Sequence, residues 1–328
     1  MNKETAPIRK IASDLYMITL PMPFRLGHVN VYVLTNGGKA VLFDTGLNIN
    51  ESRGEFGAAL DTLNLSPADI EHVFLTHFHA DHCGAASHIR QASGAAIHMS
   101  EQGARQIQRL DEMNTVIERT GSYLKAQGLP EKTIGFIEKF FILFRQVTSP
   151  FEVNAVIGPH DMITVGTRTI EAIPTPGHAN GHTCFYLKDD GILISGDHVL
   201  PDITPNLGPD LFDSSYYPLE AFLASLAGVR DLPVSMVCPA HGAPFPGLKG
   251  RVDEIIEHHR VRKQLVLDAV RKKERNTYLV ACEVFENNLT EFDKFLALNE
   301  TYVHLLELEK EKIISRKSRD NGIIHWSA

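Results

Sequence analysis

The chain has 328 residues, of which 43% are apolar and 22% are charged, a composition close to the average of globular proteins. This length suits one large domain with a small additional one. No apolar run reaches the roughly 20 residues that a spanning helix needs, so we expect no membrane association. The polar first residues contain no apolar signal segment, and we expect a cytoplasmic protein. The net charge of −8 argues against a basic surface for nucleic acid, and the four widely spaced cysteines predict reduced, buried side chains rather than disulfides.

Short apolar runs rich in β-branched residues predict strands in the first hundred residues. They cover residues 15–19, 28–35, 40–44, 72–76 and 95–99, with a helix near residues 55–63. Gly37-Gly38 predicts a tight hairpin turn between the second and third of these strands. The alternation of strands with helices that follows is typical of an α/β protein.

Residues 101–150 carry a helical pattern and read as an insertion. Its second apolar stripe includes Phe140, and residues 134–144 contain only two charged side chains, Glu138 and Lys139. A helix so apolar has two interpretations of about equal weight. It is buried between the main domain and a partner subunit, or its phenylalanines line a pocket for an acyl group.

Strands return at residues 169–173, 183–187, 192–195 and 235–238. After Gly247 the residue pattern changes and predicts charged helices at 251–273, 290–298 and 300–309. A hairpin around Asn321-Gly322 follows them. We therefore expect one domain over residues 1–250 and a second over residues 251–328. Helices followed by a hairpin resemble a winged helix.

A cluster of metal-ligand side chains follows the strand at 72–76. His77, His79, Asp81 and His82 fall within six residues, and strand alternation places His77 and His79 on the same side. Imidazole and carboxylate suit Zn²⁺, Mn²⁺ or iron. Three histidines and an aspartate so close together are hard to explain as a solvated surface, so the cluster predicts a metal site.

This cluster resembles the signature of the metallo-β-lactamase superfamily. Three further ligands expected by that resemblance are present in order, each after a predicted strand: His178, Asp197 and His241. The resemblance covers about residues 10–250 and implies an α/β fold, the αββα sandwich of that superfamily, here with a helical insertion and a small winged-helix-like domain at the C-terminus.

The resemblance also implies roles for these residues. One metal ion is held by His77, His79 and His178, and a second by Asp81, His82 and His241. The bridge between the ions is Asp197. We expect two divalent ions, Zn²⁺ first, with Fe or Mn as alternatives, which lower the pKa of a shared water to supply hydroxide and polarise a substrate oxygen. Asp81 and Asp197 are then the catalytic carboxylates, with Asp81 aligning the hydroxide or accepting its proton.

Three residues are weaker candidates for roles next to the ligands or the substrate. By the resemblance Asp44 orients a ligating imidazole, against the simpler interpretation of a turn aspartate before Gly46. His198 adjoins the bridging ligand, and Phe140 would contact an acyl group. For His182 a packed turn histidine and a supporting role are equally favoured. Histidines without ligand spacing, His259 and His304 among them, are expected to be structural or at the surface.

The motif around His77 is similar to the glyoxalase II-like branch, which implies a small-molecule ester, thioester or lactone substrate. The C-terminal extension is instead similar to the branch named for β-lactamase-like protein 2, which makes an endoribonuclease the alternative. Residues 251–328 contain fourteen basic and fourteen acidic side chains, a balance that disfavours nucleic acid as a partner. We expect this segment to serve homo-oligomer assembly or to cover the active-site mouth. A non-catalytic metal-containing binding protein is the non-enzyme alternative.

Overall fold

The computed structural model describes residues 8–23, 25–144, 147–148, 150–285 and 288–328. Its first sheet contains strands whose two faces are both apolar. In β3, Val31 and Val33 face one core cluster while Tyr32 and Leu34 face another, as side-chain alternation along a strand requires. The strands are β1 (Ile8–Lys10), β2 (Leu15–Pro21), β3 (His28–Asn36), β4 (Lys39–Phe43), β5 (Ile70–Phe74), β6 (Ala96–Ser100) and β7 (Ala155–Ile157), paired in that order.

Pairing in this sheet changes from antiparallel to parallel at β4. The strands β1 to β4 form antiparallel pairs, and β4 to β7 form parallel ones. Gly37 and Gly38 make the β3–β4 turn with φ of 56° and 81°, a backbone that glycine adopts without strain. The predicted hairpin is confirmed at this point.

The second sheet has the order β12-β11-β10-β9-β8. Its strands are β8 (Met162–Val165), β9 (Arg168–Pro174), β10 (Thr183–Leu187), β11 (Ile192–Gly196) and β12 (Met236–Pro239). It faces the first sheet across a core that includes three phenylalanines, Phe43, Phe74 and Phe185, with ring centroids 5.2 to 5.8 Å apart. The two sheets therefore share one apolar layer.

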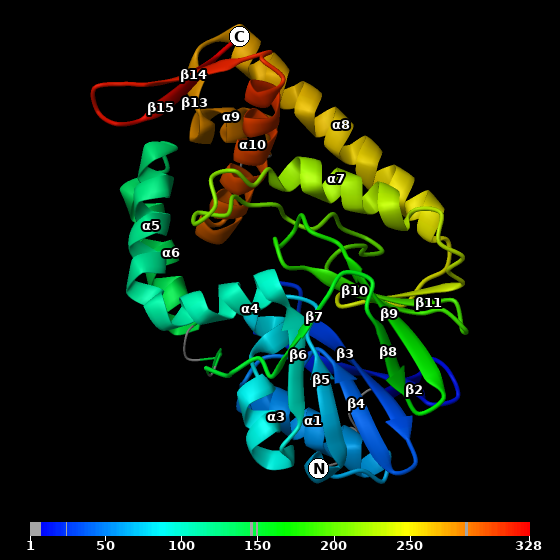
Figure 1. Cartoon of the computed structure of the whole chain (residues 1–328). Coiled ribbons are helices and arrows are strands. Elements are labelled where there is room, and N and C mark those ends of the chain that lie inside the picture. Colours follow the sequence, from blue (N-terminus) through cyan, green and yellow to red (C-terminus); the bar gives the residue numbers. More distant parts are fainter. Residues whose placement is uncertain (1–7, 24, 145–146, 149, 286–287) are drawn as a thin grey trace.

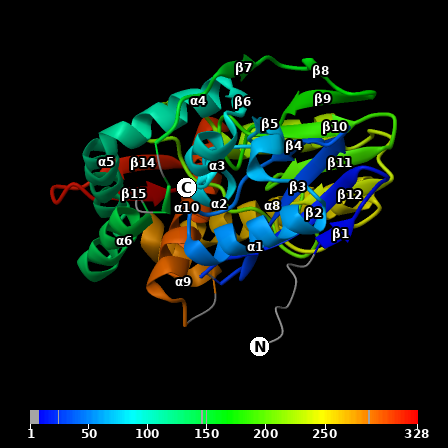
Figure 2. The ribbon, with the colours of Figure 1, turned by 90° about the horizontal axis from the view of Figure 1, so that it is seen from below.

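Helices cover the outer face of each sheet (Figures 1 and 2). On the first sheet lie α1 (Asn50–Thr62) and α3 (Ala86–Ser93), and on the second lie α7 (Pro218–Val229) and α8 (Leu248–Lys272). The predicted αββα sandwich is confirmed. The helices α3 and α7, at residues 86–93 and 218–229, were not predicted from the sequence.

The insertion is helical, as expected, and packs on the C-terminal region. It consists of α4 (Glu101–Gln108), a 3₁₀ turn (Arg109–Glu112), α5 (Met113–Ala126) and α6 (Glu131–Phe144). Phe140 and Phe141 of α6 lie against Phe292 and Phe295, with ring centroids 4.8 and 6.2 Å apart. Part of the second apolar face of α6 is thus covered by its own chain. The side chain of Phe144 lies outside the described residues.

The C-terminal region combines helices with a small sheet. Its elements after α8 are β13 (Arg275–Asn276), α9 (Thr277–Val284), α10 (Glu291–Lys310), β14 (Ser315–Ser318) and β15 (Ile324–Ser327), with sheet order β13-β15-β14. The prediction of two separate helices at 290–298 and 300–309 is wrong. They form one helix, since Asn299 and Glu300 are buried within it rather than at a break. The winged-helix likeness and the domain limits stay predictions.

The four cysteines are free, as expected, but they differ in burial. Cys83, Cys184 and Cys238 are buried, whereas Cys282 is exposed on α9, so the expectation of burial is wrong for that residue. Among the described residues, no helix combines the length and apolar character needed to cross a membrane.

Candidate metal centre

The ligand-type residues all lie just beyond the ends of strands. The segment from His77 to His82 follows β5 and enters α2 (Ala80–Cys83), whose N-cap is His79. His178 follows β9, Asp197 follows β11 and His241 follows β12. Rigid strands from both sheets therefore present these side chains, which suits a site that must hold a fixed geometry.

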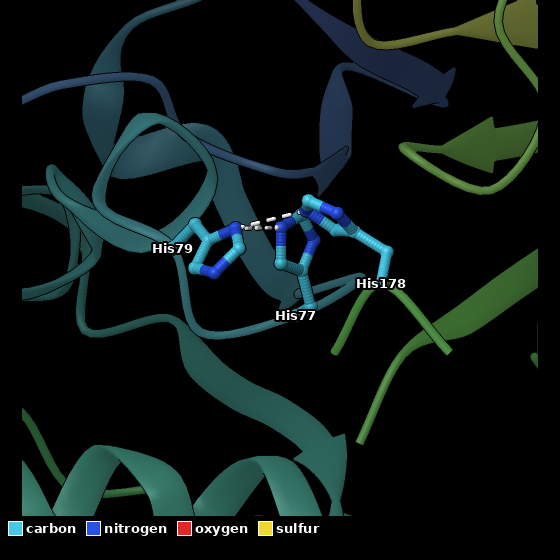
Figure 3. Close-up of side chains that lie close together, drawn as sticks. All are labelled: His77, His79 and His178. Atoms are coloured by element: carbon cyan, nitrogen blue, oxygen red, sulfur yellow. Dashed lines mark hydrogen bonds between the residues drawn. The ribbon is translucent and has the colours of Figure 1, made fainter. Parts of the chain in front are cut away.

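Three imidazoles meet at one point (Figure 3). The Nδ1 atom of His79 lies 2.9 Å from Nε2 of His77 and 3.0 Å from Nε2 of His178. Burial lowers the pKa of His77 well below its usual value and that of His79 to about 3. The rings are therefore neutral, with lone pairs available to a cation, because an imidazole must be unprotonated at the nitrogen that binds a metal.

A second group lies beside the first. The Asp81 carboxylate oxygen Oδ2 is 3.6 Å from Nε2 of His82 and 3.4 Å from Nε2 of His241. Burial opposes ionisation of Asp81, but the adjacent His82 and His241 lower its pKa to about 2. Burial likewise opposes protonation of His82, but Asp81 and Asp197 raise its pKa well above the usual value.

The carboxylate of Asp197 lies between the two groups. Its Oδ1 is 3.5 Å from Nε2 of His82 and 3.4 Å from Nε2 of His241, and its Oδ2 is 3.4 Å from Nε2 of His178. This arrangement places one oxygen toward each group, as a bridging ligand requires.

Three of these atoms are buried and have no hydrogen-bond partner among the described residues. They are Nε2 of His82, Nε2 of His241 and Oδ1 of Asp197. A buried polar atom without a partner costs about 1–3 kcal/mol, and three such atoms face one another here. Imidazole nitrogens and a carboxylate are ligands that Zn²⁺, iron and Mn²⁺ accept. The donor set therefore fits divalent ions in both groups.

Asp44 lies directly behind His82. Its Oδ1 accepts from the Thr76 backbone N–H at 2.8 Å, and its Oδ2 accepts from the Thr76 hydroxyl and from Nδ1 of His82, both at 2.8 Å. A carboxylate that accepts from Nδ1 fixes the tautomer in which Nε2 carries the lone pair. The φ of Asp44 is 61°, a left-handed conformation that aspartate and asparagine tolerate better than most residues.

Backbone carbonyls orient two other imidazoles in the same way. Nδ1 of His178 donates to the carbonyl of Asn206 at 2.8 Å, and Nδ1 of His241 donates to the carbonyl of His28 at 2.9 Å. The Asn206 side chain in turn donates to the carbonyl of Leu296 in α10 at 3.0 Å. One ligand is thus tied to the C-terminal region, a connection with no signal in the sequence.

His182 supports the backbone of Asp197. Its Nε2 accepts from the Asp197 N–H at 3.2 Å, so its Nδ1 donates to the Thr175 hydroxyl at 2.7 Å. Gly196, with φ of 49°, leaves the room for this contact, since a Cβ there would lie 2.7 Å from His182 Nε2 and 2.9 Å from Thr76 Cβ. Of the two interpretations of His182, the structure favours the supporting one.

The remaining candidates lie farther from the ligand atoms. His198 is buried, and its ring lies edge-on to Phe222 with centroids 5.2 Å apart. Phe140 is half-buried against Phe292. Their roles toward substrate stay predictions.

Comparison with known proteins agrees with this geometry. The family model described as "Metallo-beta-lactamase superfamily" matches residues 24–241, and the chain belongs to this superfamily. It is 28% identical to "Probable metallo-hydrolase YqjP" of Bacillus subtilis strain 168, over 94% of this chain and 97% of that protein. It is 26% identical to "Beta-lactamase-like protein 2 homolog" of Caenorhabditis elegans, over 97% of this chain and 88% of that protein.

A solved structure extends the likeness to the C-terminal region. The crystal structure of a metallo-beta-lactamase family protein from Thermus thermophilus superposes with a TM-score of 0.86 at 27% identity and covers 97% of this chain and 99% of that one. The superfamily membership and the relative named a metallo-hydrolase support a metal-dependent hydrolase.

Proposed function

We propose that the protein is a dinuclear metal-dependent hydrolase acting on a small ester, thioester or lactone. The observation that carries the dinuclear part is a set of buried atoms on His82, Asp197 and His241 beside a separate cluster of three histidines. In the described part of the chain, these atoms have no hydrogen-bond partner. One group holds an ion through His77, His79 and His178, and the other through Asp81, His82 and His241, with Asp197 shared. Zn²⁺ is the first expectation for both.

The chain's own residues then have distinct tasks. When bound, two divalent ions supply a water of lowered pKa and a Lewis acid for the substrate oxygen. Asp197 fixes the separation of the two groups, because its Oδ1 faces the group with His82 and His241 and its Oδ2 faces the group with His178. Asp81, whose side chain is 18% exposed against 11% for Asp197, is the carboxylate placed to accept the proton of the attacking water. No serine or cysteine nucleophile is needed.

The acyl class is proposed over phosphodiesters on two observations. The overall charge is −8, and α6 of the insertion exposes Phe136, Ile142 and Leu143 in addition to the apolar side chains that it packs against the C-terminal helices. The deciding experiment is turnover by the metal-loaded protein on a panel of thioesters, lactones, simple esters, phosphodiesters and RNA. Hydrolysis of an acyl substrate supports the proposal, whereas turnover of RNA or phosphodiesters alone would assign the nuclease alternative.

A binding measurement on the full chain tests the role expected for residues 251–328. We expect no tight RNA or DNA binding in a gel-shift titration, because the basic and acidic residues of this segment balance. A salt-dependent complex at low protein concentration would contradict this expectation, since phosphate contacts release counterions and weaken as salt rises.

The carbonyl that orients His178 offers a test away from the ligands. In Asn206→Ala the carbonyl remains but the side-chain bond to Leu296 is lost, so the loop can shift. We expect the affinity for the ion at the three-histidine group to fall about tenfold, the lower end for loss of a group that orients a ligand. Competition with a chromophoric chelator measures it. Asn321→Ala, at the tip of the C-terminal hairpin, is the control and should bind metal normally.

The interpretation that Phe140 lines an acyl pocket is tested by how kcat/KM depends on the length of the substrate's acyl chain. We expect Phe140→Ala to lower kcat/KM for long-chain acyl substrates more than for acetyl ones, by about tenfold for each 1.4 kcal/mol of lost contact. Equal losses on short and long substrates, together with a lower melting temperature, would assign Phe140 to packing against Phe292 instead.

A further inference from the structure

A second cluster of metal-ligand side chains lies in the C-terminal region, apart from the catalytic ligands. His259 comes from α8, and Glu300 and His304 come from successive turns of α10. Nδ1 of His259 lies 3.3 Å from Nε2 of His304 and 3.5 Å from Oε1 of Glu300. These separations fall in the same range as those between the ligand atoms of the catalytic groups. All three residues are buried.

Hydrogen bonds to the backbone occupy Nδ1 of His304 and Oε2 of Glu300, so Nε2 of His304 and Oε1 of Glu300 have lone pairs that face the centre of the cluster. Nδ1 of His304 donates to the Glu300 backbone carbonyl at 2.6 Å, so Nε2 of His304 presents a lone pair. Oε2 of Glu300 accepts from the Leu207 N–H at 3.3 Å, and Oε1 faces His259. His178 and His241 use backbone carbonyls in the same manner, and metal-ligating histidines generally do so.

Protons of the chain alone do not satisfy this arrangement. Two acceptors face Nδ1 of His259, which carries at most one proton. If Nδ1 is protonated, Nε2 of His259 becomes a buried acceptor, and it has no hydrogen-bond partner among the described residues. A cation at the centre would satisfy the three inward-facing lone pairs together, with the His259 proton on Nε2, an atom that has no partner among the described residues in either form.

We propose that His259, Glu300 and His304 form a third metal site, for a divalent ion that accepts imidazole and carboxylate ligands, with Zn²⁺ as the probe. The site joins α8 to α10. Through Glu300 it also holds Leu207, the neighbour of Asn206, whose carbonyl orients His178. Burial raises the pKa of Glu300 to about 7, although the Leu207 N–H and Arg262 oppose the shift, and a cation bound by the carboxylate would stabilise its charged form.

This inference does not rest on the proposed hydrolase, and metal counting can separate the two. Metal-depleted protein is reconstituted with Zn²⁺, freed of unbound metal and measured by mass spectrometry of the elements. We expect about three ions per chain, two in the catalytic groups and one here. Glu300→Gln keeps an acceptor for Leu207 and nearly the same shape but removes the charged ligand, and we expect it to retain about two ions.

Two further variants make the result specific. His72→Gln alters another close histidine pair, His72 with His98 at 3.0 Å, and should leave the wild-type count unchanged. The double variant His79→Ala/His241→Ala removes one ligand from each catalytic group, and we expect it to keep one tightly bound ion that disappears when Glu300→Gln is added. A wild-type count that does not fall by one ion in Glu300→Gln would overturn the proposal and assign the cluster to a histidine–histidine hydrogen bond.

Discussion

Replacing Asp197 with alanine is expected to lower kcat/KM about a thousandfold or more. The oxygens of this carboxylate face both ligand groups, at 3.4 to 3.5 Å from His82, His178 and His241. Metal-assisted stabilisation of a transition state is worth several kcal/mol, and a loss of roughly 4 kcal/mol corresponds to about three powers of ten. Zn²⁺ affinity should fall in parallel, because the proposed dinuclear site loses the ligand that its two groups would share.

The measurement compares kcat/KM with the catalytic metal content of the same samples. Asp213→Ala provides a matched control, since this half-buried aspartate lies in the loop before α7, where its side chain accepts hydrogen bonds from Ser215. It should leave both quantities unchanged. An Asp197→Ala variant that keeps its metal and more than a tenth of its activity would show that Asp197 does not bridge the ions.

The catalytic layers could be predicted from sequence because their signals are local. Short apolar runs rich in β-branched residues identified most strands, and the segment from His77 to His82 brings four ligand-type side chains into six residues. Separate strand ends supplied His178, Asp197 and His241 once the superfamily pattern was applied. Local spacing was therefore enough to nominate the ligands, and the fold explains why they converge.

The contacts that the sequence did not predict join residues far apart in the chain. Asn206 orients His178 through its backbone carbonyl, which no side-chain pattern reveals, and its own partner Leu296 lies ninety residues away. His259 meets His304 only because α8 packs on α10, so each appeared as a lone histidine in a charged helix. Asn299 and Glu300 look like a polar break in the sequence, whereas burial against a loop and a neighbouring helix keeps α10 continuous.

Asp44→Asn is expected to reduce the Zn²⁺ affinity of the group formed by Asp81, His82 and His241 by about 10–100-fold, with little change in fold. Asparagine tolerates the left-handed backbone at this position, so the φ of 61° should persist. The Thr76 N–H requires an acceptor at the Oδ1 position, which fixes the amide oxygen there and places the NH₂ group at the position of Oδ2. That NH₂ group then faces Nδ1 of His82.

The consequence is a change of tautomer rather than a loss of packing. An amide N–H donating to Nδ1 of His82 favours the form that carries its proton on Nε2, and a protonated Nε2 cannot bind a metal. Chelator competition gives the affinity, and circular dichroism gives the melting temperature. Asp161→Asn is the control, because Asp161 also accepts from a backbone N–H, that of Gly158, at an exposed turn outside the ligand groups. If Asp44→Asn binds Zn²⁺ as tightly as the wild type, Asp44 supports the turn before Gly46 and does not set the tautomer of His82.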